Sequence, residues 1–204
     1  GWSDGLPVVP PTEARVLRML EGTDRTPADV VAIVPPDLTP ATVEKVAINA
    51  VLAGCRPEYL PVVLTAVEAA CTDAFNMHGL LATTWFAGPM VVVSGPIARD
   101  ISMNDGLGAL GQGNRANATI GRALNLVVRN IGGGRPGGVD RATLGNPGKY
   151  TFCFAETPAP DPDWPNQATE TGLAPDTSAV TLVAAKGAAG MIAQPSRNPE
   201  SLAR

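Results

Sequence analysis

Glycine and proline divide this chain into short segments. The 204 residues include 22 glycines and 20 prolines, and both residue types interrupt helices and strands. Between them lie β-branched apolar runs, which are typical of buried strands, and longer patterns with helical spacing. Because 45% of the residues are hydrophobic, a chain of this length can bury a sizeable core as one domain. We therefore expect an α/β domain of short elements joined by many turns.

Strand and helix patterns alternate along the sequence. The expected helices are 12–20, 39–54, 56–71 and 117–131, and the expected strands are 30–34, 79–86, 89–95, 149–156 and 179–185. Thr39 and Pro40 suit the N-cap and the first position of the second helix. We predict a three-layer domain with a mixed sheet of about five or six strands. Residues 1–156 form its core, and residues 157–204 complete it with a Pro-rich loop, a last strand and a mobile tail.

Two helical segments resemble each other. Residues 40–54 (PATVEKVAINAVLAG) and 117–133 (NATIGRALNLVVRNIGG) share Ala-Thr, a β-branched residue and then a cation, Lys45 or Arg122. Each follows an apolar strand that ends in glycine or proline. A duplicated strand–helix unit would bring both helix starts to one cleft, where Lys45 and Arg122 address the same ligand. The alternative is a chance similarity between two amphipathic helices.

The stretch LGALGQGNRANATIGRAL, residues 107–124, suggests a site for an anion. Several glycines precede a helix start, where free backbone N–H groups and the helix dipole favour negative charge. Arginine adds a planar fork that matches carboxylate or phosphate. The alternative is that the glycines serve tight turns and that Arg115 is a solvated surface charge. The residues expected to bind the anion are Gly111, Gly113, Arg115, Asn117, Lys45 and Arg122.

Cys55 and His78 are the candidates for catalysis. Cys55 lies beside Arg56 between two expected helices, and a thiol near a cation and a helix start can have a lowered pKa. It should then be alkylated faster than Cys71 and Cys153, which lie in apolar runs. His78 is the single histidine and suits a general acid or base. The alternatives are a small buried residue at Cys55 and a structural hydrogen bond at His78.

Composition and spacing exclude several classes of function. A net charge of −4 and 4% aromatic residues oppose nucleic-acid binding, and no apolar run is long enough to cross a bilayer. Three cysteines without a secretion signal indicate a reducing, cytoplasmic compartment. One histidine and no CxxC pair leave no usual zinc site. Gly106–Gly111 matches GxGxxG, but it does not follow a strand directly and lacks the later acidic residue, so we expect no dinucleotide and no other cofactor.

Several longer motifs resemble a bacterial family. They are DGLPVVPPTE (4–13), ATVEKVAINAVLAGCRPEYLPVV (41–63), GPIAR (95–99), RANATIGRAL (115–124) and PGKYTFCFAE (147–156). This family is associated with the UGSC (seleno)proteins, which are named for a Sec/Cys-Gly-Ser-Cys motif. The chain has no such motif, and its nearest string is VSGP, so no redox role follows. Because related proteins continue beyond the end of this chain, the resemblance implies a subunit or a processed half.

Two functions from different classes fit these observations. The first is an enzyme or enzyme subunit that acts on a small carboxylate- or phosphate-bearing metabolite by lyase, hydrolase or thiol-dependent chemistry. The second is a non-catalytic binding or assembly subunit of a hetero-oligomer. In either case we expect a second protein subunit or a homo-oligomer as partner.

Overall fold

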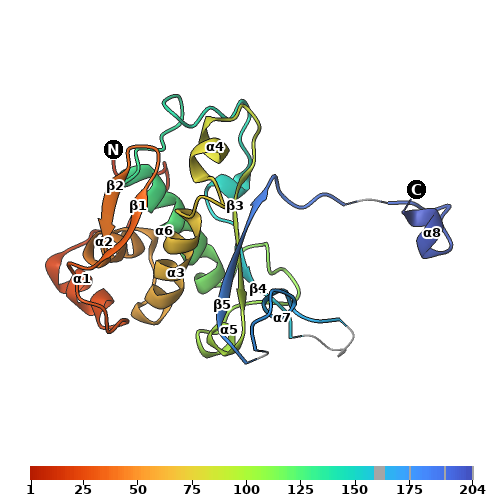
Figure 1. Cartoon of the computed structure of the whole chain (residues 1–204), viewed down its shortest axis with the longest axis horizontal. Helices are drawn as coiled ribbons and strands as arrows, with labels where there is room; N and C mark the ends of the chain where they lie inside the picture. Colours follow the sequence, from red (N-terminus) through yellow and green to blue (C-terminus); the bar gives the residue numbers. More distant parts are fainter. Residues whose placement is uncertain (159–163, 175, 191, 204) are drawn as a thin grey trace.

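The computed structural model describes residues 1–158, 164–174, 176–190 and 192–203 (Figure 1). Helices and short strands are interspersed along these residues. The helices are α1 (Glu13–Leu20), α2 (Val43–Ala53), η1 (Pro57–Tyr59), α3 (Leu60–Ala70), α4 (Met77–Ala82), α5 (Pro96–Asp100), α6 (Arg115–Asn130), η2 (Pro147–Lys149), α7 (Gln167–Glu170) and α8 (Pro199–Leu202). The strands are β1 (Val30–Val34), β2 (Thr39–Thr42), β3 (Gly88–Ser94), β4 (Cys153–Ala155) and β5 (Ala179–Ala185).

The strands belong to two sheets. β1 and β2 form an antiparallel pair, while β3 lies at the centre of a mixed sheet, parallel to β4 and antiparallel to β5. The α/β class and the mixed sheet are therefore confirmed. The expectation of five or six strands in one sheet is wrong, because the five strands of the described residues are divided between these two sheets. β5 comes from the C-terminal segment and pairs with the whole length of β3.

Two local expectations differ from the structure for identifiable reasons. Residues 39–42 are extended, because this segment turns back and pairs with β1, and Pro40 is tolerated in an edge strand. α2 therefore begins at Val43, and the Thr42 side chain accepts its N-cap hydrogen bond from Lys45 N at 3.3 Å. The apolar run from residue 79 contains the end of α4 and not a strand. Asn76 caps that helix by accepting a hydrogen bond from Gly79 N.

Helices form the layer between the two sheets. α3 contacts β1 on one side and β3 and β5 on the other, while α6 packs against α2, β3 and β4 (Figure 1). Gly121 permits the close approach of α6 to the segment before β4, since a Cβ atom there would lie 2.7 Å from Thr151 Oγ1. The fully buried side chains of this layer and of β3 include Val43, Val46, Leu60, Val63, Val67, Val91, Val93, Ile120, Leu124 and Leu126.

α2 and α6 run antiparallel to each other. Gly54, just after the end of α2, accepts a hydrogen bond from Arg115 Nε at the start of α6 (2.9 Å). Asn49, earlier in α2, accepts one from Asn130 Nδ2 at the end of α6 (2.8 Å). The two helix starts therefore lie at opposite ends of the pair and share no cleft. β1 and β3, the apolar strands that precede the two segments, also belong to different sheets, so the similarity of 40–54 and 117–133 is that of two amphipathic helices.

The N-terminal segment is fixed to α6 by an ion pair. Arg122 Nε and Nη2 each donate to a carboxylate oxygen of Asp4 at 2.8 Å, and Nη2 also donates to Pro7 O at 2.9 Å. Both side chains are largely buried, with 12% and 14% of their surfaces exposed. Burial raises the pKa of Asp4, but the Arg122 hydrogen bonds and the local backbone outweigh this effect and lower it overall.

The Asp4–Arg122 pair gives the first testable expectation. Asp4→Asn leaves the Arg122 charge partly buried without its counter-charge, so the free energy of unfolding at neutral pH should fall by about 1–3 kcal/mol. Because the folded-state pKa of Asp4 is lowered, its contribution is complete above the ordinary value of 3.8. The contribution is lost as the pH falls through the folded-state value. Urea unfolding at neutral and acidic pH measures both effects.

Asp24→Asn is the matched control for this measurement. Asp24 is exposed and forms no ion pair within the described part of the chain. Equal stability of the two variants at neutral pH would show that the pair does not stabilise the fold.

Candidate functional site

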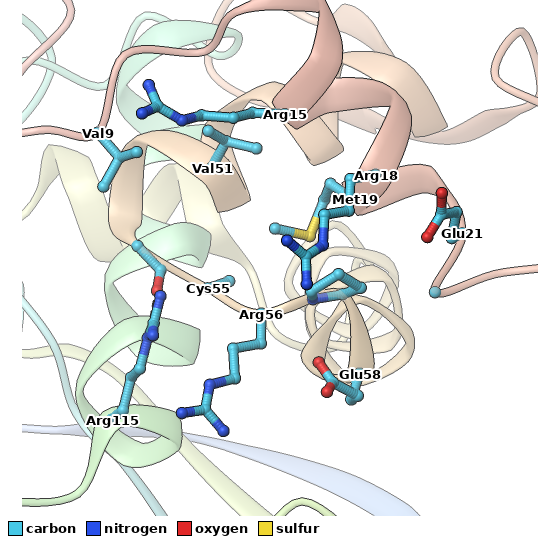
Figure 2. A pocket seen from close by; sticks show the side chains of 13 residues that line it. Val9, Arg15, Arg18, Met19, Glu21, Val51, Cys55, Arg56, Glu58 and Arg115 are labelled. Carbon is cyan, nitrogen blue, oxygen red and sulfur yellow. Dashed lines mark hydrogen bonds between the residues drawn. The ribbon is translucent and has the colours of Figure 1, made fainter.

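A cavity of about 780 Å³ opens where α1 and α2 end and where η1 and α6 begin (Figure 2). Its size is within the range of small-molecule sites. The antiparallel packing of α2 and α6 forms one wall, and α1 forms the other. The lining residues are Val9, Arg15, Arg18, Met19, Glu21, Gly22, Val51, Gly54, Cys55, Arg56, Pro57, Glu58 and Arg115.

The cavity lining carries an excess of positive charge. It includes four arginines and two glutamates. Arg15 and Arg18 are three positions apart on α1 and therefore lie on the same face of the helix. Arg56 is the N-cap residue of η1, and Arg115 is the first residue of α6. Within the described residues, none of these four arginines forms an ion pair. Their charges are available to an anion that enters the cavity.

Hydrogen bonds position two of the four guanidinium groups. Arg115 Nε donates to Gly54 O at 2.9 Å, and Arg15 Nη1 donates to Pro10 O at 2.9 Å. Arg18 and Arg56 extend from different elements at the same opening (Figure 2). Neither guanidinium donates a hydrogen bond to a described residue, and both side chains are exposed. Their N–H groups are therefore free to bind a ligand.

Arg115 lies at an unfavourable position for a cation. The first turn of an α-helix carries partial positive charge, so a guanidinium there opposes the dipole. An anion bound at this end would interact with both the arginine and the free N–H groups of α6. The sequence-based expectation that Arg115 faces an anion site is compatible with this geometry, although the partners differ from those expected.

Cys55 lines the cavity, but its thiol is buried. Its side chain donates a hydrogen bond from Sγ to Thr119 O at 3.4 Å. Burial raises the pKa of Cys55 to about 12, against smaller opposing effects of this hydrogen bond and of Arg115. The expected lowering of this pKa is therefore wrong, because loss of hydration outweighs the nearby cations. At neutral pH, Cys55 is a protonated thiol.

The structure does not bring His78 to this cavity. It is the second residue of α4, on the surface of the molecule, and it is absent from the lining. The two expected catalytic residues, Cys55 and His78, therefore do not share a site in this conformation.

The glycine-rich segment before α6 is folded against Asn117. The buried Asn117 side chain donates to Asn104 O (2.8 Å) and Ala109 O (3.1 Å), and it accepts from Asn104 N (3.1 Å). Asn117 thus holds this loop, and both N–H groups of its side-chain amide are already used. With Gly111 it lines a separate cavity of about 350 Å³, which does not include Arg115. Gly113 has a φ of +112°, for which glycine is suited, and lines neither cavity.

Lys45 and Arg122 have separate partners. Lys45 is exposed, and its Nζ donates to Pro40 O at 2.9 Å. Arg122 is occupied by Asp4, as described above. Neither residue lines the arginine cavity, so the expectation that they address one ligand is wrong. An internal carboxylate from a distant part of the sequence supplies the counter-charge that a buried arginine requires.

Sequence reasoning missed Arg15 and Arg18 as residues of this site. The spacing of these two cations on an amphipathic helix indicates only that they share a solvent-facing side. Nothing in the local sequence indicates that α1 ends beside Arg56 and Arg115. The described residues contain no group of three or more His, Cys, Asp or Glu side chains arranged to hold a metal ion. Within the same part of the chain, no helix is both long and apolar enough to span a bilayer.

Comparison with known proteins gives no further assignment. No protein-family model, curated protein or solved structure matches this chain. The resemblance to the UGSC-associated family therefore remains a prediction from the sequence motifs.

The thiols provide a test of the cavity's structure. Burial raises the pKa of Cys71 to about 11, one unit below that of Cys55, and raises that of Cys153 further still. Cys71 is also the only one of the three that is not buried. Since the thiolate is the reactive form, a short iodoacetamide pulse near neutral pH should modify Cys71 first and all three slowly. Mass spectrometry of peptides measures the order.

The unfolded protein is the control for this experiment, because its three thiols should react at similar rates. Faster modification of Cys55 in the native protein would show that the cavity opens further and that Cys55 is reactive after all.

Proposed function

We propose that this chain binds a small metabolite with several negative charges, carried by carboxylate or phosphate groups, in the arginine cavity. The observation that carries the proposal is that Arg15, Arg18, Arg56 and Arg115 line one opening without an ion pair among the described residues. Four guanidinium groups against two carboxylates favour a ligand with two or more charges. Arginine also binds such groups through paired hydrogen bonds.

We further propose that the protein is an enzyme or an enzyme subunit. Glu21 and Glu58 lie in the lining beside the arginines, and a carboxylate near a bound substrate can transfer a proton. Cys55 is at the same place, but its raised pKa favours acid–base chemistry by the glutamates over attack by a thiolate. A lyase or hydrolase reaction is thus better supported than thiol-dependent chemistry.

We propose a cytoplasmic location because of the state of the three cysteines. All three are free thiols, and thiols persist in reducing compartments.

A separate observation supports the alternative of an assembly subunit. β5 pairs with β3 on one side, and its other edge is unpaired within the described residues. α8 lies away from the body of the protein (Figure 1), and the side chains of Ile192 and Leu202 are exposed. An exposed strand edge and an apolar terminal segment are suited to a second chain. A binding assay with inorganic phosphate distinguishes the two functions: saturable binding favours the first, and an oligomer in light scattering that binds no phosphate favours the second.

Removal of one arginine tests anion binding directly. Arg56→Gln or Arg18→Gln removes a guanidinium that has no hydrogen bond to the described residues, so the fold should be unaffected. We expect each change, and Arg115→Ala, to weaken binding of inorganic phosphate or succinate by about 1–3 kcal/mol. Isothermal titration calorimetry at fixed ionic strength measures this loss.

Arg141→Gln is the matched control, because Arg141 is exposed and lies outside the cavity. It makes the same change in net charge and should leave the affinity unchanged. Similar affinities for wild type, Arg56→Gln and Arg18→Gln, or no binding of either anion by wild type, would reject the arginine cavity as the site.

A further inference from the structure

A second cavity, of about 550 Å³, lies between α4, the C-terminal half of α6 and the loop that follows α6. Its wall contains apolar side chains from all three parts, including Met77, Leu81, Val128 and Leu144. None of its lining residues belongs to the arginine cavity. Polar side chains, among them Asn125, Asn146 and Lys149, complete the lining. The volume and the combination of an apolar wall with polar groups are those of a site for a small organic molecule.

Arg129 brings an uncompensated charge into this cavity. It lies in the last turn of α6 and is partly buried. Its Nε is fully buried and has no hydrogen-bond partner. Within the described residues, its guanidinium forms no ion pair either. Burying an unpaired polar or charged group is unfavourable by several kcal/mol, so this side chain is suited to a partner that the chain itself does not supply.

The other charged side chains of the cavity are already paired. Lys149 Nζ donates to Asp140 Oδ1 at 2.8 Å. The carboxylate of Asp4 is occupied by Arg122. The charges cancel within each pair, and Arg122, which pairs with Asp4, lies outside the lining. The charge left without a partner in the lining is that of Arg129.

We infer that this second cavity binds an organic monoanion, with its carboxylate on Arg129 and an apolar or aromatic body against Met77, Leu81 and Val128. A single free guanidinium matches one carboxylate through two parallel hydrogen bonds. The apolar wall favours a hydrocarbon or aromatic body, which distinguishes this ligand from the multiply charged one proposed for the arginine cavity. The inference does not depend on that proposal, because the two cavities share no residue.

The test compares two probes with the same skeleton, 4-phenylbutyrate and 4-phenylbutan-1-ol. Titration of each into ¹⁵N-labelled protein, followed by NMR, gives the affinity and the residues affected. We expect the carboxylate to bind about tenfold more tightly than the alcohol, as for a charge-assisted hydrogen bond. The shifted resonances should include those of Leu81, Val128, Arg129 and Leu144.

Arg129→Gln should abolish the preference for the carboxylate and leave binding of the alcohol unchanged. Arg129→Lys keeps the positive charge and should retain part of the preference for the carboxylate. This variant shows whether the effect of Arg129→Gln comes from the lost charge or from a loss of folding. Arg141→Gln, an exposed arginine that does not line the cavity, should bind both probes as wild type does. A role of Arg129 in folding alone would lower the stability of the variants without changing the ratio of the two affinities.

Three outcomes would overturn the inference: equal affinity of wild type for the two probes, shifts confined to other parts of the molecule, or no saturable binding of either probe at millimolar concentration. Phosphate binding by Arg129→Gln should match wild type. Its loss would show that the variant disturbs the arginine cavity as well, and would count against a separate site.

Discussion

The antiparallel packing of α2 against α6 is the contact on which both candidate sites depend. It brings the end of α2 beside the start of α6, where Arg115 donates to Gly54 O and Cys55 to Thr119 O. This junction forms one wall of the arginine cavity. At the other end of the pair, Asn49 and Asn130 are joined by a hydrogen bond, and the neighbouring Arg129 lines the second cavity. Side chains from opposite ends of one helix thus line two separate sites.

The dipole of α6 acts differently on its two terminal arginines. Arg129 in the last turn is favoured by the partial negative charge there, whereas Arg115 in the first turn is disfavoured. The interaction of Arg129 with the dipole therefore stabilises the fold, although its Nε lacks a hydrogen-bond partner. The fold gains little from Arg115 beyond the hydrogen bond to Gly54. An anion bound at this helix start, as we propose, would offset the unfavourable interaction of Arg115 with the dipole.

The sequence patterns predict the main helices and most strands, because these depend on local periodicity and caps. The helix cap is Thr42, three residues after the expected Thr39. The non-local pairing of β2 with β1 keeps residues 39–42 extended and outweighs the local Thr-Pro helix signal. Of the residues that line the arginine cavity, the sequence patterns single out Arg115 and Cys55, with Arg56 beside Cys55. They pair Arg115 with the glycine loop, however, because the two are adjacent in sequence.

Side-chain partners from distant segments explain the remaining differences. Asp4 is far from Arg122 in the sequence, yet their ion pair removes Arg122 from any ligand site. Asn117 is likewise occupied by the loop that was expected to cradle the anion. The raised pKa of Cys55 follows from burial, which a short sequence window does not reveal. In each case the residue type was interpreted reasonably, and tertiary contacts decided its chemistry.

The charge distribution separates the two sites physically. With a net charge of −4, the chain as a whole does not attract anions, so selectivity must come from charges within about one Debye length of the ligand, on the order of 8–10 Å. Arg18 and Arg56 are exposed, and their attraction for an anion is screened by salt and shared with water. Arg129 has its Nε out of water beside an apolar wall, where a charge is screened less and a missing partner is less favourable. For the multiply charged ligand that we propose in the arginine cavity, this exposure predicts binding that weakens as salt rises. For the monoanion that we propose in the second cavity, it predicts a weaker dependence on salt and a larger contribution from the fit of the apolar body.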